Sequence, residues 1–151
     1  MFTNLLVTLD GSRGAEAILP YVIDVSKRLG AAVTLMRVVN TLGATQVSTS
    51  ERGAVGRPQT RDDLRRKGEA EARDYLERQA RNIRCFDIHV EVVVRSGDPA
   101  HEIVTAASEC GADTIAMATH SRRGLDRLML GSVAERVLHS ATVPLVLVRV
   151  D

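Results

Sequence analysis

A cluster of hydroxyl, imidazole and guanidinium side chains follows an apolar run late in the chain: Thr119, His120, Ser121, Arg122 and Arg123. Gly131 and Ser132 come soon afterwards and open a helical pattern. A helix that begins after a small residue offers free backbone N–H groups, which bind phosphate, and nearby arginines assist them. Ser132 with Glu135 also matches the S-x-x-E capping box, in which Ser132 caps the helix. The two interpretations are compatible, because a cap uses only part of the free N–H groups.

A phosphate site alone would hold a small molecule weakly. A helix N-terminus contributes about 0.3–1 kcal/mol to the binding of an anion, whereas micromolar affinity needs about 8 kcal/mol. A nucleotide would therefore need further contacts to its base and ribose. Asp10 ends the first apolar run and is placed to accept a ribose hydroxyl. An Asx turn or a helix N-cap explains Asp10 equally well, so the residues alone leave both roles open.

The common motifs for catalysis and metal binding do not occur in this sequence. Neither G-x-x-x-x-G-K-[ST], G-x-G-x-x-G nor G-x-S-x-G is present, and the histidines and cysteines lack the spacing of metal ligands. His120 is the one histidine near the predicted site. We interpret it as a loop residue or a neighbour of phosphate, with a catalytic role as the alternative.

The apolar pattern alternates between two periods along the chain. Short apolar runs predict five strands, at residues 4–9, 31–39, 87–95, 113–119 and 144–150. Helical spacing predicts four helices between them, at 13–29, 61–84, 99–110 and 133–140. Pro20 should bend the first helix or start a new turn in it. Polar residues alternate at the start of the third strand, which is typical of a sheet edge.

Strands that alternate with helices indicate an α/β fold with one doubly wound, five-stranded parallel sheet. Right-handed crossovers leave few topologies, and we expect the order 3-2-1-4-5 with the first strand in the centre. Ligands of such sheets bind beyond the carboxyl ends of the strands, where the winding direction reverses. The site is therefore predicted where Asp10 and the segment 118–132 meet.

Composition excludes several classes of function. The 151 residues carry 20 Lys and Arg against 19 Asp and Glu, a net charge of +1 that argues against binding nucleic acid by bulk charge. Aromatic residues make up 3% with no Trp, too few for stacking nucleic acid or clamping a flavin between rings. No apolar run reaches the length of a membrane span, and the N-terminus lacks the pattern of a secretory signal. We therefore expect a cytoplasmic protein with reduced cysteines.

The length fits a single domain over residues 1–151. Residues 40–60 are rich in Gly, Ser, Thr and Gln without periodicity. We predict a mobile surface loop inserted there, with a lid over a ligand as the alternative.

The sequence resembles the universal stress protein (UspA-like) family over nearly its whole length. The resemblance rests on L-V-T-L-D-G-S at the first strand, A-I-L-P-Y in the first helix and G-D-P at 97–99. The most specific parts are T-H-S-R-R-G-L-D-R-L-M-L-G-S-V-A-E-R-V and the final V-P-L-V-L-V-R. It implies an adenine nucleotide alpha hydrolase-like fold, binding of ATP, ADP or AMP with or without Mg²⁺, and a homodimer formed through the last strand, Leu145–Val150. A role in the response to stress follows from the same resemblance.

Nucleotide-binding members of that family carry G-x-x-G-x9-G-[ST], and this chain keeps only the final Gly131–Ser132. Ala118 and Ser121 stand where the two earlier glycines would be. The methyl group of Ala118 is a mild change, whereas Ser121 would be strained by about 1 kcal/mol if that position needs a positive φ. The hydroxyl of Ser121 could instead contact a phosphate.

The resemblance also implies roles for individual residues. Asp10 would contact the ribose or the base, and the backbone of Val38 would contact adenine. Phosphates would contact Gly131, Ser132 and Val133, and the candidate site also includes Ala118, His120, Ser121 and Arg122.

Three hypotheses of function follow. The first is an ATP-binding regulator of the stress response that acts as a dimer, without robust catalysis and with at most slow ATP hydrolysis, because no residue resembles a general base beside a water. The alternative is a nucleotide-free interaction module whose phosphate loop has degenerated. The third is an enzyme that acts on a small phosphorylated ligand through His120.

Overall fold

A computed structural model describes residues 2–41, 60–120 and 130–150, including His120 as backbone only. The predicted loop at 40–60 therefore falls, over 42–59, outside the described residues. No helix of the described ranges is long and apolar enough to cross a membrane.

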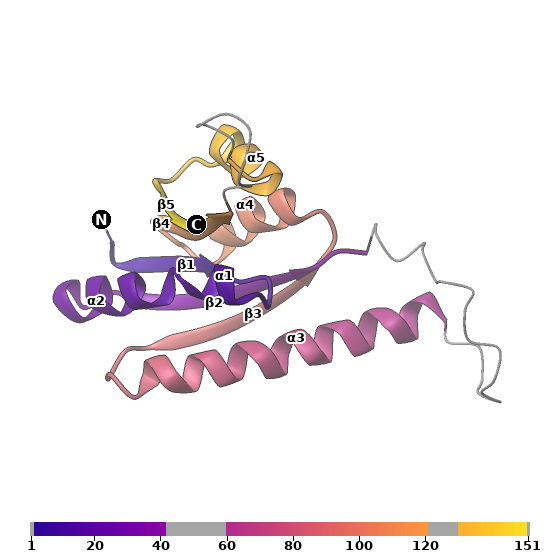
Figure 1. The fold of residues 1–151 in the computed structure, drawn as a ribbon, viewed down its shortest axis with the longest axis horizontal. Helices are drawn as coiled ribbons and strands as arrows, with labels where there is room; N and C mark the ends of the chain where they lie inside the picture. The colour runs from indigo at the N-terminus through magenta and orange to yellow at the C-terminus, as the bar shows by residue number, and fades with distance from the viewer. Residues whose placement is uncertain (1, 42–59, 121–129, 151) are drawn as a thin grey trace.

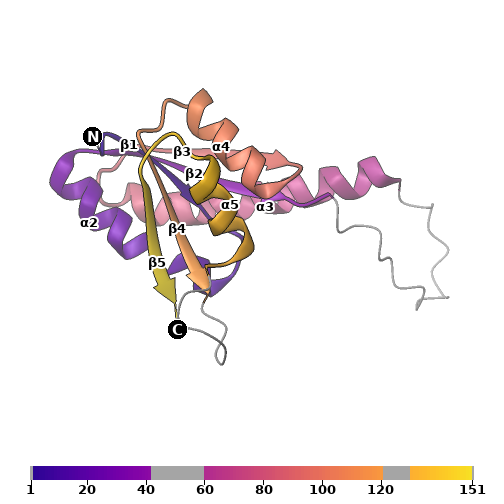
Figure 2. The ribbon, with the colours of Figure 1, turned by 90° about the horizontal axis from the view of Figure 1, so that it is seen from above.

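One parallel sheet forms the centre of the molecule (Figures 1 and 2). Its strands are β1 (Asn4–Thr8), β2 (Ala32–Val39), β3 (Val90–Ser96), β4 (Thr114–His120) and β5 (Leu145–Val150). Their order, β3-β2-β1-β4-β5, confirms the predicted topology with the first strand in the centre. β3 lies at an edge, as its polar alternation predicted. It begins three residues later than expected, because Asp87 has a φ of 63° in the turn before it.

The helices begin and end close to their predicted positions: α1 (Arg13–Glu16), α2 (Leu19–Leu29), α3 (Arg61–Arg84), α4 (Pro99–Glu109) and α5 (Ser132–Ser140). The single helix predicted over 13–29 is divided into α1 and α2. Pro20 lies in the first turn of α2, where its missing N–H costs nothing. Pro20 therefore starts a new helix, which was one of its two predicted effects.

Helices cover both faces of the sheet, and each face has its own apolar core. α1, α2 and α3 pack on one face, where Leu5, Val7 and Leu35 are buried against Ile18 and Leu76. α4 and α5 pack together on the other face. In Figure 1 they lie on the opposite side of the sheet from α3. Alternate residues of β1 serve the two cores, which is why its sequence is apolar almost without interruption.

Candidate functional site

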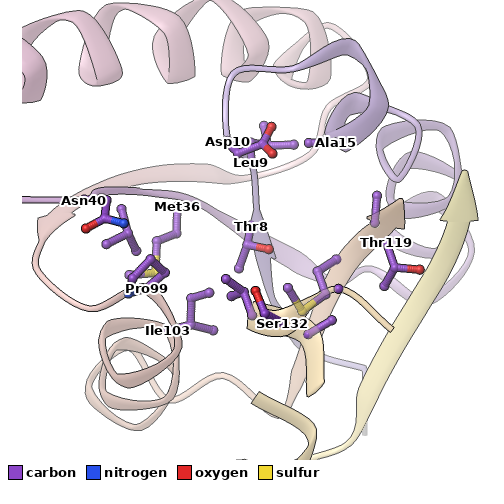
Figure 3. A pocket seen from close by; sticks show the side chains of 16 residues that line it. Thr8, Leu9, Asp10, Ala15, Met36, Asn40, Pro99, Ile103, Thr119 and Ser132 are labelled. Carbon is purple, nitrogen blue, oxygen red and sulfur yellow. The ribbon is translucent and has the colours of Figure 1, made fainter. Parts of the chain in front are cut away.

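A pocket of about 380 Å³ opens at the carboxyl ends of β1, β2 and β4 (Figure 3). β1 pairs with β2 on one side and with β4 on the other, so the winding of the chain reverses at this point. Asp10, Val38, Ala118, Gly131, Ser132 and Val133 all line this pocket. Six of the nine residues predicted for the site are thus brought together from four segments that are distant in the sequence.

Asp10 lies in the turn between β1 and α1. Its Oδ1 atom accepts a hydrogen bond of 2.8 Å from the backbone N–H of Ser12, which is an Asx turn. The helix cap is Ser12, whose hydroxyl accepts from the backbone N–H of Ala15 at 3.1 Å. Of the two structural roles left open for Asp10, the turn is therefore confirmed and the N-cap is wrong. The turn uses one carboxylate oxygen, and Asp10 still lines the pocket.

Val38 lies near the end of β2, beyond the last residue of β1. The carbonyl of Met36 accepts a hydrogen bond of 2.8 Å from Leu9 N–H. Backbone groups of alternate residues in a strand point to the same side, so those of Val38 point toward the pocket past the end of β1. A backbone contact from Val38 to a bound base stays a prediction, and the position of the residue suits it.

The start of α5 differs from the predicted capping box. Gly131 is the N-cap, with a ψ of 150°, and Ser132 is already the first helical residue. The backbone N–H of Glu135 is bonded to the carbonyl of Gly131 at 2.9 Å, in the ordinary helical pattern. The prediction that Ser132 caps α5 is therefore wrong. No side chain caps α5 among the described residues, and both Gly131 and Ser132 face the pocket.

Ala118 belongs to the regular part of β4, where it pairs with Val148. A strand conformation makes no demand for a positive φ, so a methyl group at this position is unstrained. His120 ends β4, but its side chain is not described, and Ser121 and Arg122 lie outside the described residues. The roles predicted for these three residues stay predictions.

Sequence reasoning missed further residues of the pocket lining, of which Met36, Ile103 and Met117 are aliphatic. The residues missed are Thr8, Met36, Asn40, Ile103 and Met117, and Thr119 also lines the pocket. Their shared signal is their position at the carboxyl ends of strands or near the start of a helix. Figure 3 shows Met36, Asn40 and Pro99 on one side of the pocket and Thr119 on the other, with Thr8, Ile103 and Ser132 between them. The pocket lining thus combines aliphatic side chains with a helix N-terminus.

An ion pair joins the two helices that flank this pocket. Asp98 caps α4 by accepting a hydrogen bond of 3.0 Å from the backbone N–H of His101. Arg136 of α5 donates two hydrogen bonds to the same carboxylate, at 2.7 and 2.8 Å. The Arg136 guanidinium, together with the bond from His101, holds the pKa of Asp98 below its usual value. Sequence reasoning missed Arg136, because 38 residues separate it from Asp98.

Metal ligands are not grouped in the part of the chain that the structure describes. It holds no set of three or more His, Cys, Asp or Glu side chains that could bind a metal ion. The described lining of the pocket offers a carboxylate, threonine and serine hydroxyls, an amide, and backbone N–H groups at a helix start.

The family model and the similar proteins all point to the same family. The model of the group described as "Universal stress protein family" matches residues 1–149. Universal stress protein YxiE of Bacillus subtilis is 29% identical over 150 residues, which cover 99% of this chain and 100% of that protein. The solved structure of MJ0577, a universal stress protein of Methanocaldococcus jannaschii, superimposes with a TM-score of 0.82 at 25% identity, covering 100% of this chain and 98% of that one.

Two further solved structures share the fold, and each is described with a bound nucleotide. A universal stress protein from Arabidopsis thaliana, described with AMP bound, has a TM-score of 0.67 at 15% identity and covers 99% of this chain and 92% of its own. Another, described as a complex with cAMP, has a TM-score of 0.60 at 16% identity over 99% of this chain and 98% of its own. At these identities the likeness is one of fold.

Proposed function

The chain belongs to the universal stress protein family, and on that premise we propose that it binds an adenine nucleotide (ATP, ADP or AMP) in the pocket at the ends of β1, β2 and β4. We propose further that it acts as a homodimeric, cytoplasmic regulator of the stress response without robust catalysis. The main support for nucleotide binding is that Asp10, Val38 and the start of α5 line the same pocket.

The shape and size of the pocket support this proposal. Its volume of about 380 Å³ lies in the usual range for small-molecule sites, roughly 300–1,000 Å³. Met36, Ile103 and Met117 give the pocket lining an aliphatic surface that suits the flat apolar faces of a base. In a chain with so few aromatic residues, adenine would lie between aliphatic side chains and be recognised by backbone groups near Val38.

The start of α5 suits the phosphates. Gly131 caps the helix without using a side chain, so the first N–H groups of α5 are available to an anion. An added Cβ at Gly131 would meet no described atom within 4 Å, which leaves room for a phosphate beside the backbone. The Asp10 carboxylate lines the same pocket and is placed to accept a ribose hydroxyl.

Relatives support the nucleotide class. Two proteins with this fold are described with AMP and with cAMP, which share the adenine base and ribose. We include Mg²⁺ only as a companion of the nucleotide phosphates, because the described residues offer no cluster of metal ligands of their own.

Calorimetric titration of the purified chain with ATP, together with nucleotide analysis by native mass spectrometry, tests the proposal. We expect one nucleotide per chain. Gly131→Val should abolish binding by filling the approach to the helix start, and Asp10→Ala should weaken it about ten-fold by removing the ribose contact. An assay of phosphate release should show no robust hydrolysis of ATP.

Asp24→Ala is a suitable control for the loss of a carboxylate. Asp24 is exposed on α2 and pairs with Arg28 at 2.9 Å, on a helix that does not line the pocket. This variant should bind ATP as the unmodified chain does. No co-purified nucleotide and no heat at high ATP concentration would overturn nucleotide binding and favour the nucleotide-free interaction module. ATP affinity that is unchanged in both Asp10→Ala and Gly131→Val would show that the site is elsewhere.

A further inference from the structure

Arg37 lies between two pocket-lining residues but points away from the pocket. Met36 and Val38 line the pocket, and successive side chains of a strand alternate between the faces of the sheet. The guanidinium of Arg37 is therefore on the α3 side, where its Cζ atom is 5.3 Å from the centre of the Tyr75 ring. A guanidinium over an aromatic ring is held in place by electrostatic attraction and by stacking.

The same guanidinium also lies against the turn that carries Asp10. A Cβ atom added at Gly11 would lie 3.0 Å from Cζ and Nη1 of Arg37. Gly11 also has a φ of 89°, a conformation that only glycine adopts without strain. Arg37 thus packs directly against the residue that follows Asp10, and a side chain at Gly11 would require the guanidinium to shift.

Tyr75 is itself fixed by hydrogen bonds between α3 and α1. Its hydroxyl donates to Oε1 of Glu16 at 2.9 Å, and Gln79 donates to the same oxygen at 3.3 Å. The Tyr75 side chain is 9% exposed. Burial, the bond to Glu16 and the nearby Asp10 carboxylate raise the pKa of the Tyr75 hydroxyl, and Arg37 opposes that rise. Asp10, Glu16 and Arg37 therefore all act on one buried group.

We propose that Arg37 is a positioning residue for Asp10: its guanidinium, seated on Tyr75, supports the turn at Gly11 and so holds the Asp10 carboxylate at the pocket. Asp10 lies beyond the end of β1, and its bond to Ser12 orders it only within its own turn. The contact with Arg37 connects that turn to β2 and α3. This proposal rests on the proposed binding of an adenine nucleotide.

The test compares ATP with 2′,3′-dideoxy-ATP, which lacks the ribose hydroxyls, by calorimetry on the full chain. The unmodified protein should prefer ATP. Arg37→Met keeps most of the unbranched stem of the side chain but removes the guanidinium. It should weaken ATP binding about ten-fold, the effect of losing the ribose hydrogen bond to the Asp10 carboxylate. It should also bring the ratio of the two dissociation constants toward one, as should Asp10→Asn. In the Asp10→Asn background, Arg37→Met should have little further effect.

Arg28→Met is the matched control, because it also removes one positive charge. Arg28 pairs with Asp24 on α2, a helix that does not line the pocket. The Arg28→Met variant should keep the ATP affinity of the unmodified chain and the same preference for ATP over the dideoxy compound. Tyr75→Phe keeps the ring under Arg37 but loses the bond to Glu16, and it serves as a second variant if Arg37→Met does not fold. It should reduce the same preference less strongly.

Three results would overturn this positioning role while nucleotide binding stands. One is an Arg37→Met or Tyr75→Phe variant that keeps the full preference for ATP over the dideoxy compound. Another is an Arg37→Met effect that is equally large with and without Asp10→Asn. The third is an unmodified protein that binds both nucleotides equally, because Asp10 would then not contact the ribose. If the unmodified protein binds neither nucleotide, the proposed function fails and the positioning role with it.

Discussion

Asp113 connects the beginnings of β1 and β4 through one carboxylate. Its Oδ2 atom accepts hydrogen bonds from the backbone N–H of Thr3 at 2.8 Å and from the Thr3 hydroxyl at 2.6 Å. The Thr114 hydroxyl donates to its Oδ1 atom at 3.2 Å. Desolvation opposes ionisation, but the hydrogen bonds from Thr3, Asn4 and Thr114 outweigh it and lower the pKa of Asp113 to about 2. A carboxylate that accepts several hydrogen bonds is stabilised in its charged form.

We expect Asp113→Asn to destabilise the protein at neutral pH. The loss of charge-assisted hydrogen bonds worth about 1 kcal/mol would lower Tm by about 2–4 °C for a chain of this size. The folded-state pKa lies below the value of the unfolded chain, so the stabilising contribution is complete above pH ~4 and is lost as the pH falls toward about 2. Thermal unfolding followed by circular dichroism at several pH values measures this.

The difference in Tm between the two proteins should therefore shrink between pH ~4 and about 2. A difference that is constant over that range would show that the charge of Asp113 contributes nothing. Asp24→Asn is a suitable control, because its partner Arg28 lies on the same helix and both side chains are largely exposed. Exposed pairs of this kind contribute little to stability.

At the scale of elements, glycine ends α2 and lets the chain turn into β2. Gly30 has a φ of 69° and a ψ of 27°, and its backbone N–H is bonded to the carbonyl of Ser26 at 2.8 Å. An added Cβ would meet no described atom within 4 Å, so space is not the constraint. The left-handed conformation alone explains why a glycine is needed here.

Gly30→Ala should therefore destabilise the chain by about 1 kcal/mol, the cost of a left-handed backbone for a residue with a Cβ. Gly30→Asn should cost less, because asparagine tolerates this conformation. Urea denaturation of the two variants and the unmodified chain gives the comparison. Equal stability of all three would mean that α2 ends without strain, and an equal loss in both variants would point to a steric cause instead.

Most elements could be predicted from local patterns. Pro20 and Gly30 mark the two ends of α2, and Asp98 with Pro99 marks the start of α4. The start of α5 could not be predicted in the same way. Ser132 and Glu135 have the spacing of a capping box, but Gly131 has the extended conformation of a cap. Sequence spacing does not say which of two adjacent small residues leaves the helical conformation.

At the scale of the whole molecule, β5 is an edge strand. It pairs with β4 on one side, and no described strand pairs with its other side. Val146 is 36% exposed on this strand. An apolar edge with a single charged residue, Arg149, can pair with another strand, and we propose that Leu145–Val150 pairs with the same strand of a second copy.

Val146→Lys should convert the proposed dimer to a monomer, because edge lysines oppose strand pairing between copies. Sedimentation velocity measures the masses. Leu64→Lys is the matched control, since Leu64 is 37% exposed on α3, and it should leave the dimer intact. A monomeric unmodified chain, or a dimer that persists in Val146→Lys, would contradict a dimer formed through β5.

The sequence by itself determined the order of strands and helices, the parallel sheet and the end of the sheet at which the pocket lies. These follow from periodicity, glycines and prolines, which act on neighbouring residues. Only the tertiary structure decided which distant side chains meet, such as Arg37 with Gly11 and Tyr75, or Asp98 with Arg136. Such contacts depend on how helices pack across the sheet, and local patterns do not encode that geometry.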